Sequence, residues 1–259
     1  MTGLNTATPL TRFGSRVPAV AARKATTAAS AAAVATPAAT ITSMVICLPD
    51  GLPAQALTAT ALHRHFGVTG TLQPRFWAKP DLWLWQPAQL IGLRKGRPAP
   101  CAGGPVKLLD LDGLRHAAAI AAGVRHQIWQ QVVHGTRPAH LWQVFQSRHL
   151  ADPATYPQDR AAADFWNQPR INAMRMHNAA GYGTTHLPLP EVEVFQAGPM
   201  AYQHFHATTA VCADALLTAD GHKLTPASDA LAHRVTYLEQ AGRYLNTIEP
   251  SQRLLAITF

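Results

Sequence analysis

The sequence predicts an α+β fold: a ferredoxin-like (split βαβ) unit with a large, mainly helical insertion. Patterns typical of strand, helix, strand and strand follow one another over residues 43–109. A helix and a strand complete the unit within residues 191–259, and helical periodicity fills residues 110–190 between the two halves. A chain of 259 residues is long enough for one large domain or two small ones.

The first half of the predicted unit begins with a continuous apolar run, residues 44–48, which is typical of a buried strand. A helix is expected over 53–66, with Gly67 as its left-handed stop. The aromatic-rich runs 75–79 and 82–85 flank a Pro-Asp turn signal and predict a hairpin.

The insertion is expected to hold three helical runs, followed by long loops from residue 151 to 190. Asp112 is the expected N-cap of the first run, and Pro138 begins the third. Apolar side chains at helical spacing are expected to face inward, namely Leu114, Ala118 and Ala121, then Val124, Ile128 and Val132, and finally Leu141, Val144 and Phe145.

The second half of the unit is expected to start with two short strands, 191–195 and 201–206. Thr225 as N-cap and Pro226 at the first helical position predict the last helix. Apolar residues at helical spacing form one face of this helix. A closing strand over 253–259 follows it.

Residues 1–42 form a low-complexity, basic segment that is rich in Ala, Thr, Ser and Pro and contains no acidic residue. Three interpretations stay open. The segment fits a weakly ordered tail, an organellar targeting sequence, or an extension upstream of a true start at Met44.

Charge is distributed unevenly along the chain. Residues 1–109 contain eleven Lys and Arg against two acidic residues, whereas residues 110–259 contain eleven against twelve. Such a one-sided positive field attracts polyanions, so the pattern favours RNA or DNA as partner. A solubility bias or an acidic protein partner would give the same composition.

Several classes of protein are disfavoured. Cys47, Cys101 and Cys212 form no Cys-x-x-Cys pair, which predicts neither disulfides nor a zinc knuckle and favours the cytoplasm. No apolar run reaches the roughly 18 residues that a membrane span needs. The motifs of nucleotide cofactors are missing, and the histidines lack companion ligands at diagnostic spacing, so we expect no cofactor and no metal.

The candidate reactive cluster is His63-Arg64-His65 at the end of the predicted helix, where the helix dipole favours a protonated imidazole. The alternative is that these residues only cap the helix. Trp83 and Trp85 share one face of their predicted strand and suit either the core or base stacking. The expected RNA contacts are Arg23, Lys79, Trp83, Arg94, Lys95, Arg97, Lys107, Arg115, Arg125, Arg137 and Arg243.

With its predicted βαββ order, the helix ending in His63-Arg64-His65 and the helical insertion, the chain resembles the CRISPR-associated RAMP endonucleases that mature guide RNA, most of all the version of type IV systems. The resemblance covers about residues 44–109 and 225–259.

The resemblance implies metal-independent cleavage of precursor CRISPR RNA, in which a ribose 2′-hydroxyl attacks the adjacent phosphorus and leaves a cyclic phosphate. His63 or His65 would act as acid or base, and Arg64, Arg75 and Arg94 would stabilise charge. The protein would remain bound to its RNA product and would assemble with other subunits of an effector complex. The alternative function is a non-catalytic RNA-binding subunit of a ribonucleoprotein.

Overall fold

The computed structural model describes residues 39–48, 63–64, 66–181 and 185–259, and these belong to one unit, Thr36–Phe259. The predicted helix over 53–66 therefore lies largely outside the described residues. Its predicted end is confirmed, because Gly67 has a φ of 63° and its N–H donates to the His63 carbonyl at 2.9 Å.

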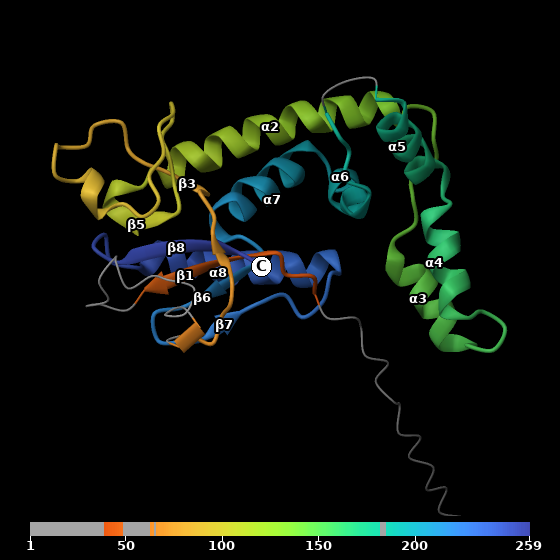
Figure 1. The fold of residues 1–259 in the computed structure, drawn as a ribbon. Coiled ribbons are helices and arrows are strands. Elements are labelled where there is room, and N and C mark those ends of the chain that lie inside the picture. The colour runs from red at the N-terminus through yellow and green to blue at the C-terminus, as the bar shows by residue number, and fades with distance from the viewer. Residues whose placement is uncertain (1–38, 49–62, 65, 182–184) are drawn as a thin grey trace, which may run out of the picture. The chain divides into compact units, whose positions relative to one another are not determined.

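The main sheet is built around the first and last strands, both predicted from apolar runs (Figure 1). β1 (Ser43–Leu48) pairs antiparallel with β8 (Arg253–Thr258) along its whole length. On its other side β1 runs parallel to β6 (Ala215–Leu217), which forms a hairpin with β7 (Lys223–Leu224). All six residues of β1 are buried, so both faces of the sheet are covered.

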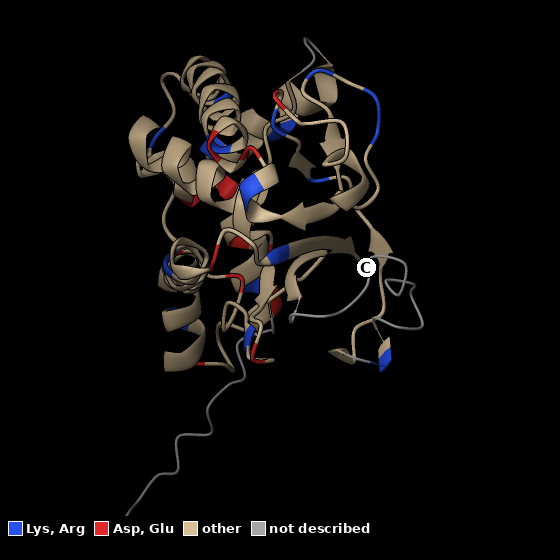
Figure 2. Cartoon of the chain, turned by 90° about the vertical axis from the view of Figure 1, so that its left-hand side faces the viewer, with Lys and Arg blue, Asp and Glu red and all other residues tan. Residues whose placement is uncertain are grey.

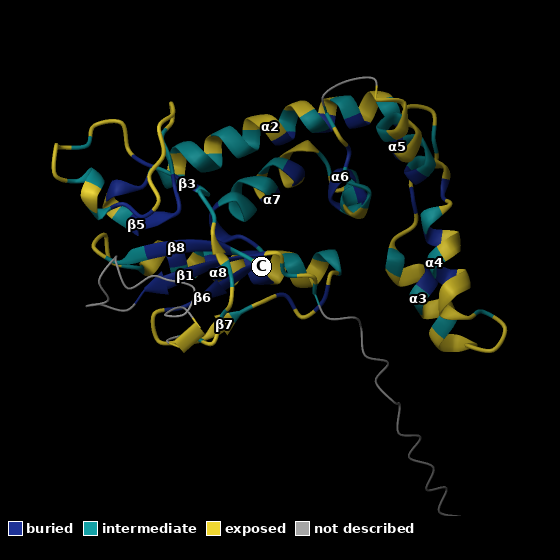
Figure 3. Ribbon diagram, in the orientation of Figure 1, coloured by how far each residue is buried: buried dark blue, intermediate teal, exposed yellow. Residues whose placement is uncertain are grey.

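Alternate residues of β1 enter two different apolar clusters. Val45 and Cys47 join the larger cluster, which includes residues from the long helices, while Met44, Ile46 and Leu48 join a smaller one. Figure 3 shows the resulting band of buried residues along the sheet.

The structure combines a mixed sheet with helices, which is compatible with the predicted α+β class. The C-terminal strand lies beside β1, which is also the arrangement in a split βαβ unit. In that unit an antiparallel strand separates the first strand from its parallel partner, whereas here β1 and β6 pair directly. The order across the sheet is β2-β8-β1-β6-β7.

The predicted hairpin of 75–79 with 82–85 is wrong. β3 (Phe76–Trp77) pairs with β4 (Pro100–Cys101) in a separate two-stranded sheet, and residues 82–85 form no strand. Pro80 and Pro87 have no N–H to donate to a strand ladder, and they flank the turn that replaces the strand. β2 (Thr71–Leu72), which the sequence did not suggest, pairs with β8.

One long helix, α2 (Leu111–Val132), replaces the first two predicted helical runs. Asp110 rather than Asp112 is the N-cap, since its Oδ1 accepts from the Gly113 N–H at 2.9 Å. Val124 is 52% exposed, against the prediction, because the face that packs on α7 (Pro199–Cys212) carries Ala122, His126 and Trp129.

The predicted strands 191–195 and 201–206 are helices instead, a short α6 (Val192–Gln196) and α7. Pro199 occupies the first turn of α7, which is favourable in a helix, and Tyr202 and Phe205 lie three residues apart on its buried face. The Phe195 ring stacks between Trp129 and Tyr202, with centroids 5.1 and 4.1 Å away, and so ties α6 to both long helices.

Residues 151–190 are mostly helical as well, contrary to the loops predicted. α3 (Trp142–Ala151) begins four residues after Pro138, which was the predicted start. α4 (Gln158–Trp166) and α5 (Pro169–Ala180) begin at prolines, Pro157 as N-cap and Pro169 in the first turn, so these prolines start helices rather than break them. Phe145 of α3 is buried as predicted, whereas Leu141 and Val144 are 44% and 38% exposed. The described residues also form three 3-10 turns, η2 (Pro87–Gln89), η3 (Val106–Leu108) and η4 (Leu189–Glu191). A short strand, β5 (Gly103–Pro105), pairs with β8.

The last helix, α8 (Leu231–Thr247), begins later than Pro226. Its N-cap residue is Ala230 and no side chain caps it, so the predicted capping role of Thr225 is wrong. The Ser228 hydroxyl accepts from the Ala230 N–H at 3.2 Å just before the helix. Within the part of the chain that the structure describes, no helix combines the length and apolar character needed to cross a membrane.

Candidate nucleic-acid interface

The segment between β3 and β4, residues 78–99, is the part of the described chain where exposed cations and exposed aromatic rings occur together, and we call it the arm. Its base is firmly attached. Ala78, Leu90 and Ile91 are at most 8% exposed, and Ile91 exchanges two backbone hydrogen bonds of 2.8 Å with Gly103 and Ala102. A further bond from the Arg94 N–H to the Pro100 carbonyl closes the second half of the arm into a hairpin-like loop.

The cations of the arm are Lys79, Arg94, Lys95 and Arg97, and all four are exposed. None of them forms an ion pair with any residue that the structure describes. Asp81 is the one acidic residue in the segment. Figure 2 turns this side of the molecule toward the viewer and shows Lys and Arg along its loops. Unneutralised guanidinium and ammonium groups on adjacent loops are the groups that bind phosphate oxygens.

The aromatic part of the arm is a tight turn. The Trp83 N–H donates to the Gln86 side chain at 2.8 Å, and the Gln86 N–H donates back to the Trp83 carbonyl at 2.9 Å. Leu82 packs against the core, while Trp83, Leu84 and Trp85 are 72%, 101% and 63% exposed. The predicted alternation of faces is therefore wrong: both tryptophans and the leucine between them point to solvent.

Of the predicted catalytic residues, His63 and Arg64 are exposed and His65 lies outside the described residues. Arg75 is placed differently. Its Nε and one terminal nitrogen donate to the carbonyls of Ala210 and Thr209 at 2.8 and 2.6 Å, at the end of α7. Burial lowers the pKa of Arg75, and attraction to Asp214 opposes that change. Its guanidinium is engaged within the fold.

The other predicted RNA contacts lie on separate elements. Lys107 is exposed in η3, next to the base of the arm, whereas Arg115 and Arg125 are half-buried on α2. Arg115 pairs with Asp112 at 2.9 Å. Arg137 and Arg243 are exposed, on the loop after α2 and on α8 respectively, and Arg23 lies outside the described residues.

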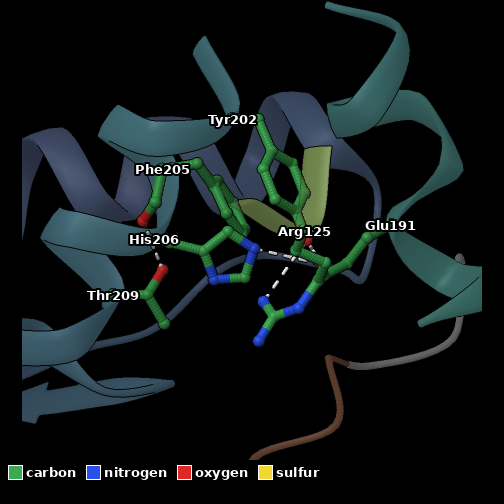
Figure 4. A network of polar contacts seen from close by, with 6 residues as sticks. All are labelled: Arg125, Glu191, Tyr202, Phe205, His206 and Thr209. Carbon is green, nitrogen blue, oxygen red and sulfur yellow. Dashed lines mark hydrogen bonds and ion pairs between the residues drawn. The ribbon is translucent and has the colours of Figure 1, made fainter. Parts of the chain in front are cut away.

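A polar network that sequence reasoning missed joins α2, η4 and α7 (Figure 4). Glu191 accepts from the Tyr202 hydroxyl at 2.8 Å and from His206 Nε2 at 3.1 Å, and Arg125 reaches the same hydroxyl at 3.4 Å. The i, i+4 spacing of Tyr202 and His206 indicates in the sequence that the two side chains share a helix face. Their shared acceptor, Glu191, lies on another element, so the sequence did not predict the network.

Burial alone would raise the pKa of Glu191, but its bonds with His206 and Tyr202 and the charge of Arg125 outweigh burial and lower it. Burial and the neighbouring Glu191 carboxylate raise the pKa of Tyr202. The side chains of Glu191 and His206 are 17% and 18% exposed. The network satisfies polar groups between packed helices, which is a structural role.

The cysteines are buried as free thiols. Burial raises the pKa of Cys101 and Cys212 to about 11 and that of Cys47 to about 12, so these thiols stay protonated and unreactive near neutral pH. Within the described ranges, no three His, Cys, Asp or Glu side chains are grouped so as to hold a metal ion.

Comparisons of this chain with protein-family models, with curated proteins and with solved structures found no match.

Proposed function

We propose that this chain binds RNA through the arm. The observation that carries the proposal is the placement of Lys79, Arg94, Lys95 and Arg97 on one anchored segment, exposed and without a described acidic partner. Each phosphate that such a group neutralises releases a condensed counterion, so the contacts stabilise the complex and make its affinity depend on salt.

Neutralising three cations of the arm should weaken RNA binding strongly. The triple variant Arg94→Gln, Lys95→Gln, Arg97→Gln removes three phosphate contacts. For a single strand this should reduce the slope of log affinity against log salt by about 2, and it should lower affinity roughly 100-fold at about 0.1 M salt. Fluorescence anisotropy with labelled RNA, titrated between about 50 and 200 mM salt, measures both quantities.

A matched control removes the same charge elsewhere. Arg148, Arg160 and Arg175 are exposed on α3, α4 and α5. Their Gln variants should keep the parental slope if the arm is the interface. An equal loss in both triple variants would mean that overall charge, and not the arm, attracts RNA, and a flat salt profile of the parent would remove the proposal.

The proposal extends to the class of RNA that the family resemblance implies, a precursor CRISPR RNA hairpin or the guide RNA made from it, held in the cytoplasm within an effector complex. The antiparallel pairing of β1 with the C-terminal strand supports a ferredoxin-like origin of the sheet. The direct parallel pairing of β1 with β6 departs from that origin.

Cleavage is a second candidate function, favoured by the exposure of His63 and Arg64 directly before the helix stop at Gly67. A histidine at a helix end is suited to exchange protons near neutral pH. The chain would then be a metal-independent endoribonuclease.

The variant His63→Ala, His65→Ala should slow cleavage in EDTA by about 10²- to 10⁴-fold while RNA affinity stays at the parental value. Denaturing gels of labelled hairpin RNA measure the rate, and His204→Ala, at an exposed position on α7, is the control. Cleavage by the double variant at the parental rate would contradict the assignment. An RNA that the parent shifts without cleaving would identify a non-catalytic subunit.

A further inference from the structure

Trp83, Leu84 and Trp85 are three consecutive large apolar side chains that face solvent, and the core does not explain them. Leu82 already supplies the packing contact of this turn. Single exposed apolar residues are ordinary, whereas a run of three at a loop tip is typical of a surface that a ligand covers.

The turn holds the backbone that carries these side chains in a defined position. Both of its hydrogen bonds join Trp83 to Gln86, one through the backbone and one through the side chain. The segment is anchored again at Leu90 and Ile91, which are 8% and 7% exposed. A rigid aromatic ring loses little conformational freedom when a ligand binds. Exposed rings at this turn are therefore well suited to bind a ligand, whereas they do not improve the solubility of the protein.

The charge beside the rings selects the ligand. Lys79 precedes the turn by four residues, and Arg94, Lys95 and Arg97 follow it on the same anchored segment. A ligand that satisfies both features needs flat aromatic surfaces and regularly spaced anions. Unpaired nucleotides have both, because each base exposes a π-face and each link carries a phosphate. In a duplex the base faces are stacked inside the helix and cannot reach the indoles.

We propose that Trp83 and Trp85 form a stacking platform for the unpaired bases of a single-stranded RNA segment, whose phosphates are held by Arg94, Lys95 and Arg97. The inference rests on the proposed RNA-binding function and adds the structural class of the RNA: single-stranded, with little dependence on base sequence, because every base can stack.

The test compares Trp83→Ala, Trp85→Ala with the parent on two RNAs, an oligouridylate of about 12 nucleotides and a mixed-sequence duplex of about 12 base pairs. The double variant should bind the single strand more weakly by roughly 5- to 150-fold for each base that loses its partner, and should bind the duplex as the parent does. Thermal melting should match the parent, because both side chains are exposed.

Two further variants separate stacking from simple apolar contact. Trp83→Phe, Trp85→Phe keeps aromatic faces and should recover most of the affinity. Leu84→Ala removes the most exposed apolar side chain, which cannot stack on a base, and should weaken RNA binding far less than the double Ala variant does. Quenching of tryptophan fluorescence by oligouridylate should be smaller in the double Ala variant.

The outcomes are distinct. If the double Ala variant binds the single strand like the parent while the arm cation variant does not, the platform is wrong and the RNA-binding function stands. If the parent binds neither RNA, the proposed function fails. If the Trp and Leu84 variants lose binding to vesicles of anionic lipid while single-strand affinity is unchanged, the turn is a membrane contact and the inference is overturned.

Discussion

Replacing Arg75 with Met should lower the free energy of unfolding by about 2 to 4 kcal/mol, because it removes charge-assisted hydrogen bonds at a half-buried site. The guanidinium donates to the Thr209 and Ala210 carbonyls in the last turn of α7, where carbonyls run out of helical partners. The Thr209 carbonyl also accepts from the Ala213 N–H at 2.9 Å. A third contact reaches the Ser43 hydroxyl at 3.5 Å, at the start of β1. The substitution would remove the Arg75 donors from both carbonyls and would remove the positive charge that attracts Asp214.

Urea denaturation followed by circular dichroism measures the loss as a shift of the midpoint at unchanged slope. Arg75→Lys keeps the positive charge but cannot present two nitrogens in a fork, so it should fall between Met and the parent. Lys79→Met removes an exposed cation and should change the free energy of unfolding by no more than about 0.5 kcal/mol. Equal midpoints for Arg75→Met and Lys79→Met would show that the buried contacts do not stabilise the fold.

This result also decides how activity data at Arg75 are interpreted. Arg75 is a predicted catalytic residue, yet its donors face carbonyls of α7. A loss of RNA cleavage in Arg75→Met would follow from the loss of folded protein. Activity therefore has to be compared at equal folded fraction, well below the unfolding midpoint of the variant.

Arg75 also illustrates what a sequence can and cannot predict. β1 and β8 were predictable because a strand buried on both faces needs a continuous apolar run, which is a local pattern. The hydrogen-bond partners of Arg75 lie 134 and 135 residues further along the chain, and no local sequence pattern predicts them. A buried arginine that caps a helix and an exposed one that binds phosphate look the same in sequence.

The wrong predictions share a physical cause. Val192 and Val194 alternate as in a strand, and the short segment 201–206 has too few apolar residues to fix either period. The aromatic stack of Trp129, Phe195 and Tyr202 favours helices at both places. In the arm, the cations Arg94, Lys95 and Arg97 are exposed as their predicted role requires, whereas the strand predicted over 82–85 is wrong. The sequence did not predict that Leu84 and Trp85 are exposed, because large apolar side chains are expected in the core.

The second large effect is expected at Asp214, which fastens the beginning of β1. Its Oδ2 accepts from the backbone N–H groups and hydroxyls of Thr42 and Ser43 at 2.7 to 3.1 Å. Asp214→Ala should lower the free energy of unfolding by about 2 to 3 kcal/mol, since Ser43 is buried and its N–H would lose a charged acceptor. Among the residues that the structure describes, Asp229 accepts from the N–H and hydroxyl of Thr40, at an exposed site, and Asp229→Ala should cost less than about 1 kcal/mol.

The loss at Asp214 should depend on pH in a defined direction. Burial would raise the pKa of this carboxyl, but the bonds from Thr42 and Ser43 outweigh burial and lower the pKa below its ordinary value of 3.8. A carboxyl with a lowered pKa in the folded state contributes its full stability above the unfolded pKa and loses it as pH falls through the folded value. Parent and Asp214→Ala should therefore differ by a constant amount between about pH 5 and 7 and converge below about pH 4. A difference that persists undiminished in acid would mean that Asp214 acts through packing, and that its charge does not hold the first strand in place.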